Sequence, residues 1–306
     1  MRIRRGSKPS ALSLVLAGLI ISAGRDASPA RAQGLPTAAE NLTPGDIDSE
    51  HLFGFTEGSD LGVPGEVEME WETSGRLGRR LGRFVALDTG LALKVPLASD
   101  IRIAPGITFN AYDIGAPGLP ARLSGGVNGA FIETRLRLID RRTGPFGLTL
   151  NVVPSFGGVD AGSGAGARSF GAEVGLLADY ELVPGTLVAA VNASLSFADT
   201  RLTNGDARLL GSGIEVAGAL AYRLRPGLFV GGEARYARSH GGLTLGPLAG
   251  QAAYLGPTLY ATLSPQAWAS FTWSFQVAGR AEGEPGPLDL TGFDRHQMRL
   301  RVGYSF

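Results

Sequence analysis

The sequence predicts an all-β protein, a transmembrane antiparallel up-and-down β-barrel of twelve strands. Three observations predict it. Apolar and polar residues alternate with a period of two from Glu66 onward, which is typical of strands. The connections between the alternating runs are short and long in turn. Aromatic residues recur near both ends of the apolar faces, as they do at the two interfaces of a membrane.

Twelve runs carry the alternation. The run 146–156 illustrates it, because its even-numbered residues from Phe146 to Val152 are apolar, whereas Gly147, Thr149 and Asn151 share the other face. The predicted strands are about 65–73, 83–95, 101–113, 126–139, 146–156, 169–182, 187–198, 209–224, 228–238, 252–263, 268–279 and 295–306.

Short connections such as 225–227 follow every second strand, and longer ones such as 114–125 lie between them. An even number of strands with short turns on one rim and long loops on the other is the pattern of bacterial outer-membrane barrels. Closing the sheet removes both edges, which a backbone in lipid cannot leave unpaired. We therefore expect short periplasmic turns and longer extracellular loops.

A soluble β-sandwich would alternate in the same way. Two features argue against it. The polar faces hold Gly, Ala, Ser, Thr and Asn rather than the lysines that keep soluble sheets dissolved. Phe146 and Phe156, like Phe170 and Tyr180, lie ten residues apart on one strand. That is roughly 33 Å of strand, or about 25 Å at a tilt of about 40°, which matches the apolar band of a membrane barrel.

Composition excludes several classes of function. The chain has 306 residues, no cysteine and a formal net charge of zero. It therefore has no disulfide scaffold, thiol nucleophile or zinc finger, and it lacks the basic face that nucleic acid requires. No apolar stretch after residue 32 is long enough for a membrane helix. We expect no cofactor and no metal, since the acidic residues 46–50 lack the frame and glycine of a calcium loop.

Residues 1–32 read as a secretory signal peptide. Arg2, Arg4, Arg5 and Lys8 precede the apolar stretch 11–24, and Ala30-Arg31-Ala32 supplies a cleavage motif. Residues 33–63 are polar and contain one apolar cluster, Leu52-Phe53-Gly54-Phe55. They form either a periplasmic N-terminal segment or a lumen plug. The barrel is expected to occupy residues 64–306.

The last nine residues, 298–306, alternate apolar side chains and end on Tyr304-Ser305-Phe306. This segment resembles the C-terminal insertion signal of the Gram-negative outer-membrane β-barrel superfamily, with Tyr304 and Phe306 as the signal residues. The resemblance is to porin-like barrels of about 12 strands, without selecting a subfamily. It implies assembly by the barrel-assembly machinery and residence in the bacterial outer membrane, in contact with its lipid and lipopolysaccharide.

If the apolar faces look outward, charged side chains line the lumen. The first strand presents an acidic row, and the last strand, its neighbour after closure, presents arginines. The predicted pore lining is Glu66, Glu68, Glu70, Glu72, Arg102, Glu133, Arg135, Arg137, Glu233, Arg235, Arg295, Arg299 and Arg301. These charges would either orient hydrated solutes or neutralise one another and close a narrow lumen.

The sequence thus predicts a narrow passive channel for small hydrophilic solutes. A structural or surface-binding protein with a plugged, non-conducting lumen is the alternative. An enzyme is not expected. A twelve-stranded outer-membrane phospholipase would need a serine–histidine pair at the upper rim, and His296 stands near that rim without such a serine or an orienting acid.

Overall fold

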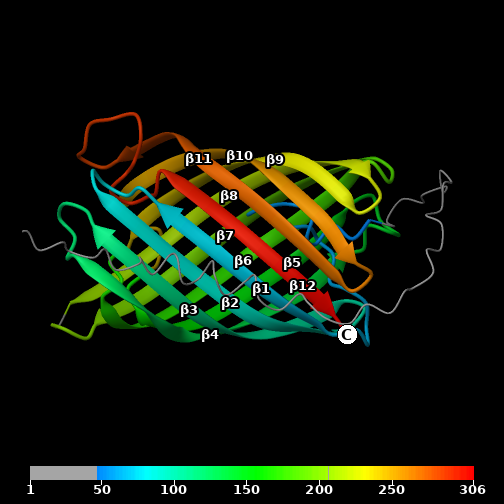
Figure 1. The fold of residues 1–306 in the computed structure, drawn as a ribbon, viewed down its shortest axis with the longest axis horizontal. Helices are drawn as coiled ribbons and strands as arrows, with labels where there is room; N and C mark the ends of the chain where they lie inside the picture. The colour runs from blue at the N-terminus through cyan, green and yellow to red at the C-terminus, as the bar shows by residue number, and fades with distance from the viewer. Residues whose placement is uncertain (1–46, 206) are drawn as a thin grey trace, which may run out of the picture. The chain divides into compact units, whose positions relative to one another are not determined.

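The computed structural model describes residues 47–205 and 207–306, which belong to one compact unit. They form a closed barrel of twelve antiparallel strands in chain order, with β1 beside β12 (Figure 1). The strands are β1 (Glu68–Leu77), β2 (Arg83–Ala98), β3 (Ile101–Gly115), β4 (Arg122–Ile139), β5 (Gly147–Val159), β6 (Gly166–Val183), β7 (Leu187–Leu202), β8 (Arg208–Arg225), β9 (Leu228–Gly241), β10 (Leu248–Ser264), β11 (Ala267–Ala281) and β12 (His296–Ser305).

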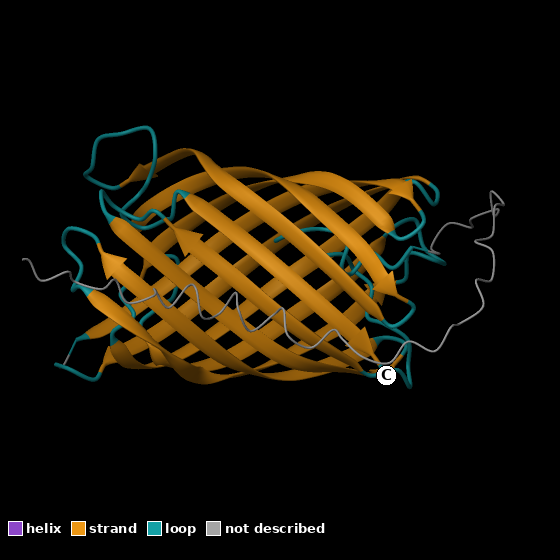
Figure 2. Cartoon of the chain, viewed as in Figure 1, coloured by secondary structure: helices purple, strands orange, loops and turns teal. Residues whose placement is uncertain are grey.

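Figure 2 shows strands and loops throughout the described part of the chain. No helix among these residues is long and apolar enough to cross a membrane. The predicted signal peptide, residues 1–32, and residues 33–46 lie outside the described residues.

The alternation seen in the sequence separates the two surfaces of the barrel wall. Outward-facing Val191, Leu220 and Leu255 are each at least half exposed, whereas their inward neighbours Ala190 and Ala219 are buried. A sheet with large apolar side chains outside and small or polar ones inside is inverted relative to a soluble protein. The predicted all-β barrel of twelve strands is therefore confirmed.

Most strands extend further than the sequence runs suggested. β6 covers Gly166–Val183 rather than 169–182, and β1 begins at Glu68 and ends at Leu77. The loop between β1 and β2 is thus only 78–82, and it turns at Gly78, whose φ of 74° suits glycine. Small residues at the strand ends had suggested loops, but they continue the hydrogen-bonded ladder because closure supplies each strand with two partners.

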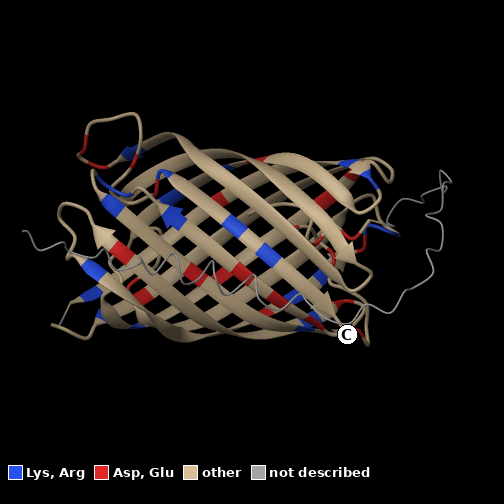
Figure 3. Cartoon of the chain, viewed as in Figure 1, with Lys and Arg blue, Asp and Glu red and all other residues tan. Residues whose placement is uncertain are grey.

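β1 and β12 close the barrel by pairing along their full lengths, from Glu68 opposite Ser305 to Leu77 opposite His296. In Figure 3 acidic residues, in red, follow one another along β1, and basic residues, in blue, lie on the adjacent β12. Tyr304 and Phe306, the predicted insertion-signal residues, are exposed at the short-turn end, with ring centroids 5.2 Å apart.

Candidate functional site

Residues 47–63, here called the lumen segment, run among the inward-facing side chains near the short-turn end of the barrel. The segment has no strand partners, so side chains of the wall must satisfy its backbone groups. Glu233 of β9 accepts hydrogen bonds from the N–H groups of Phe55 (2.7 Å) and Thr56 (3.1 Å). Its other oxygen accepts from the hydroxyls of Thr272 (3.1 Å) and Ser274 (3.0 Å).

Three further wall residues bind the backbone of the segment. Asn192 of β7 accepts from the N–H of Glu57 (2.7 Å), and its amide donates to the carbonyl of Glu57 (2.8 Å). Asp179 of β6 accepts from the N–H of Ser59 (2.6 Å), and the hydroxyl of Thr149 donates to the Ser59 carbonyl (2.6 Å). This pattern of paired donors and acceptors fixes the register of the segment inside the wall.

An apolar contact anchors the same segment. Leu52 and Phe53, from the apolar cluster noticed in the sequence, are at most 2% exposed. Together with Ile47 they pack on Val188, Ala190, Ala219, Ala221 and Phe229 of β7, β8 and β9. Burying each of the two larger side chains contributes about 1.5–3 kcal/mol. The inward alanines therefore form the floor of an apolar site and leave room for Leu52 and Phe53.

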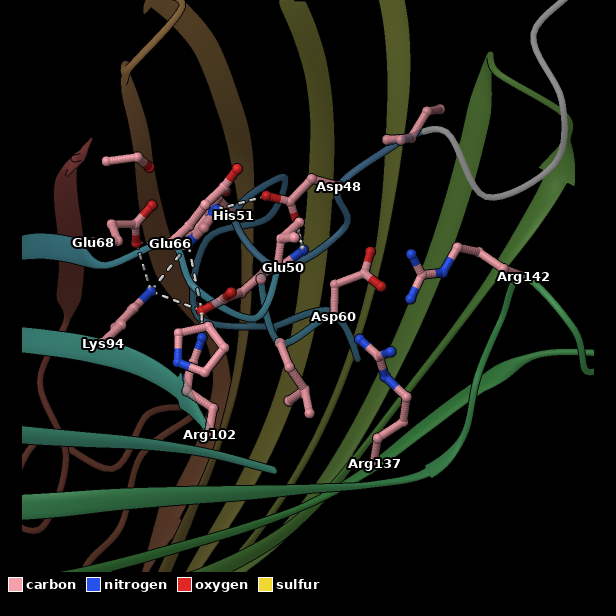
Figure 4. Close-up of a pocket in the computed structure, with 16 residues that line it drawn as sticks. Asp48, Glu50, His51, Asp60, Glu66, Glu68, Lys94, Arg102, Arg137 and Arg142 are labelled. Atoms are coloured by element: carbon pink, nitrogen blue, oxygen red, sulfur yellow. Dashed lines mark hydrogen bonds and ion pairs between the residues drawn. The ribbon is translucent and has the colours of Figure 1, made fainter. Parts of the chain in front are cut away.

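A buried charge cluster lies at the start of the segment (Figure 4). Glu50 is 2% exposed and pairs with Lys94 of β2 (2.7 Å) and with Arg102 of β3. Lys94 also binds Glu70 (2.7 Å) and Glu68 (3.2 Å) of β1. Buried charges are tolerated only when they are paired. Arg102 pairs with Glu133 of the wall and with Glu50, so the lumen segment supplies one of its two carboxylate partners.

His51 completes this cluster. Its Nε2 atom lies 3.0 Å from Lys94 Nζ and 3.3 Å from Glu68, and its ring stacks on Trp268 of β11 at 3.8 Å. Burial would raise the pKa of Glu50, but Arg102 and Lys94 hold it well below its usual range. Burial would lower the pKa of His51, but Glu50 and Glu68 raise it well above its usual value.

Carboxylates and an imidazole gathered this closely could ligate a metal ion. The candidate ligand atoms of His51, Glu68 and Glu70 lie within 4.8 Å of one another, as do those of Asp48, Glu50 and His51. However, Lys94 Nζ stands within 3.2 Å of Glu50, Glu68 and Glu70. The ammonium group already supplies the positive charge that a metal would bring, so the donor set does not fit a cation site.

The acidic row of β1 therefore differs from the expectation that it pairs with β12. Glu68 faces Ser305 on β12 and Lys94 on β2. Only Glu72 reaches an arginine of β12, with its carboxylate 3.3 Å from Arg299 Nε. The register places Lys94 of β2 beside Glu68 and Glu70 of β1, and Lys94 forms ion pairs with both.

Glu57 of the lumen segment is held among arginines of the barrel wall. It pairs with Arg135 of β4 and lies 3.3 Å from Arg299 of β12. Burial raises the pKa of Glu57, but Arg135 and the other arginines outweigh it and lower the pKa to about 2. The ring of Phe55 lies beside these groups, 3.8 Å from the guanidinium of Arg235 and 4.7 Å from that of Arg299.

On the long-loop side of Glu57 the lumen is hollow. Two cavities of about 490 and 540 Å³ share Glu57, Asn151, Glu173 and Arg299 in their linings, and together they are here called the vestibule. A third cavity, of about 240 Å³, opens at the short-turn end and is lined by Glu50 and His51. Lys94 lines both this cavity and the vestibule, so the Lys94 cluster separates the two.

The predicted pore-lining residues divide into three groups. Ten contact the lumen segment or its ion-pair partners: Glu68, Glu70, Glu72, Arg102, Glu133, Arg135, Glu233, Arg235, Arg299 and Arg301. Glu66 and Arg137 line the cavity at the short-turn end. Arg295 is not brought together with them, because it is exposed and precedes β12.

The pore-lining prediction left out several residues that hold the lumen segment. Lys94 carried a signal, because it is the only lysine after residue 32. Asp179 carried only the weak signal of an acidic residue within the run 169–182. Asn192 and Trp268 carried no signal, since their role depends on what lies inside the barrel. His296 packs edge-on against Phe275, with centroids 5.4 Å apart, and against Trp273 at 6.3 Å.

A closed, antiparallel twelve-strand barrel with an apolar outside and a charged inside has the porin-like fold of outer-membrane β-barrels. The chain belongs to the Family of unknown function (DUF6662), whose profile matches residues 46–306. No curated protein matches the sequence.

Solved structures of an outer membrane channel and of two porins are similar to this chain at low sequence identity. The COG4313 outer membrane channel from Pseudomonas putida F1 superposes with a TM-score of 0.58 at 11% identity, covering 81% of this chain and 98% of that one. The NanC porin gives a TM-score of 0.46 at 9% identity, covering 77% and 98%. The KdgM porin in complex with disordered oligogalacturonate gives 0.44 at 10%, covering 78% and 99%.

Proposed function

We propose that this protein resides in the bacterial outer membrane and passes small hydrophilic solutes passively through its lumen. The observation that carries the proposal is the vestibule, two adjoining cavities of about 490 and 540 Å³ whose walls carry serine, asparagine, glutamate and arginine side chains. A hydrated, polar lumen inside an apolar wall suits water-soluble molecules rather than lipids. The likeness of the fold to an outer membrane channel agrees with this.

We further propose that the lumen segment sets how much the channel conducts. The Lys94 cluster and the apolar anchor stand between the vestibule and the short-turn end. Solutes would pass when the segment shifts or leaves its site. This proposal also covers the plugged alternative, because a segment that never moves would give a non-conducting barrel.

Planar-bilayer recording of the refolded chain tests the channel. The full chain is expected to give brief, discrete openings, and a variant lacking residues 47–61 a continuous current that is several-fold larger. Removing the segment exposes the unpaired charges of the wall, and this could impair folding. A second variant is therefore needed that keeps the segment.

The chain contains no cysteine, so an engineered disulfide can lock the segment. A Cβ placed on Gly147 of β5 would lie 3.0 Å from the Cβ of Ser59, slightly less than the spacing of about 3.5–4.5 Å in disulfides. The double variant Ser59→Cys, Gly147→Cys should be silent when oxidised and open after reduction. The single variant Ser59→Cys is the control, because a Cβ at Gly147 alone would overlap the Ser59 hydroxyl. Absence of current from the full chain, the deletion and the reduced double variant would refute the channel.

A further inference from the structure

The vestibule wall formed by β5, β6 and β7 contains an acid that the rest of the lumen leaves unpaired. Glu173 of β6 faces both cavities. The neighbouring acids are compensated, since Glu57 and Glu72 meet Arg299, and Glu215 lies 3.4 Å from Arg235. Among the described residues, Glu173 has no ion pair. Its carboxyl group is therefore available to a solute.

A second, independent feature lies beside it. Asn151 of β5 is only 6% exposed and lines both cavities, yet its Oδ1 atom has no hydrogen-bond partner in the described structure. A buried amide oxygen without a donor costs free energy unless a ligand or water supplies one. Asn151 is opposite Gly175, the second residue after Glu173, so the two side chains are diagonal neighbours on the inner face.

The strand register adds further oxygen atoms to this patch. Ser196 of β7 lies directly opposite Glu173, and Ser194 lies opposite Gly175. On the inner face of β6, Glu173 is flanked by Gly171 and Gly175, which lack side chains that would crowd its carboxylate. The result is a recess in the wall, bounded by one carboxylate, one amide oxygen, hydroxyl groups and the side chain of Val153, which lies opposite Glu173 on β5.

We propose that this recess binds the ammonium group of a small organic cation. The inference rests on the proposed channel and names the class of solute that the channel favours. An ammonium group has three N–H donors, which match the carboxylate of Glu173, Oδ1 of Asn151 and the hydroxyl of Ser196. A divalent metal is a poorer match, because calcium takes six to eight oxygen ligands with more carboxylates among them. The two cavities are of the size that small organic ligands occupy.

Butylammonium is the probe, and block of the potassium current in planar bilayers is the readout. The variant Glu173→Gln should raise the half-blocking concentration at least about tenfold, as expected for loss of a charge-assisted hydrogen bond. Asn151→Ala keeps the charge and should raise it about threefold. Glu282→Gln removes the same charge from an exposed loop position and should change nothing.

Calorimetric titration of butylammonium into the detergent-solubilised chain separates this inference from the channel proposal. Binding that Glu173→Gln abolishes and Asn151→Ala weakens would support the recess even if no variant conducts. Equal affinity in the unmodified chain and in Glu173→Gln would overturn the inference, even in a conducting barrel. A loss confined to Glu173→Gln with no effect of Asn151→Ala would also overturn it, because general charge attraction would then suffice.

Discussion

On the short-turn side of Glu57, here called the lower half, the lumen segment fills most of the lumen and leaves one small cavity, whereas the upper half, on the long-loop side, is hollow. Both halves have the same wall of small inward-facing residues, and both are rich in charge. In the lower half the charges are buried and meet the lumen segment, as Lys94 and Arg102 meet Glu50. In the upper half, Glu173 faces open space. The contents of a barrel this narrow therefore depend on one short segment more than on the wall.

The largest expected effect comes from removing the cation at the centre of the lower half. Lys94→Met leaves Glu50, Glu68 and Glu70 buried together without their shared ammonium group. Breaking a buried ion pair costs about 3–5 kcal/mol. Protease cleavage within residues 47–63 of the refolded barrel should therefore become much faster. Arg83→Met, which breaks an exposed pair with Asp113, should have almost no effect. Equal protection of the two variants would contradict the buried cluster.

The apolar anchor should give the next largest effect. Phe53→Ala removes a fully buried ring from its site against β7–β9, at a cost of about 3–5 kcal/mol. The segment should leave its site more often, so the open fraction in bilayer recordings should rise. Phe156→Ala, which removes a lipid-facing ring, is the matched control. An unchanged open fraction in Phe53→Ala would mean that the segment does not limit conduction.

A smaller effect is expected from pH. Burial and the nearby Asp48 raise the pKa of Asp60 to about 6, and the pKa of His51 is raised well above its usual value. Because both pKa values are raised in the docked state, protonation of Asp60 and of His51 favours docking of the segment. Docking should therefore weaken as pH rises, first through about 6 for Asp60 and then through the higher pKa of His51.

Bilayer recordings from pH 5 to 9 should show this as a growing open fraction. The pKa values of Glu50 and Glu57 are lowered, to about 2 for Glu57, so both stay ionised throughout that range. The double variant His51→Gln, Asp60→Asn should flatten the pH profile. A profile that rises toward acid pH would show that the signs assigned here are wrong.

The sequence predicted the strands of the barrel wall much better than it predicted how residues pack inside the lumen. Alternation of the kind seen in 146–156 is local, so the strands and their inward and outward faces could be read directly. The ion-pair partners of Lys94 could not be predicted, because they come from β1 and from the lumen segment. Their approach to Lys94 depends on how the strands pair in the closed barrel. The Leu52–Phe55 cluster showed that something apolar precedes the barrel, but not where it packs.

The lumen segment has a consequence for the order of assembly. It precedes β1 in the chain, yet its carbonyl at Phe53 accepts a hydrogen bond from Arg301, 248 residues later, and the N–H of Phe55 binds Glu233. Contacts so distant in sequence form late, because the intervening chain must be organised first. The lumen segment can therefore dock fully only after β12 has formed. A nascent barrel is therefore expected to stay hollow until its final strand pairs with β1.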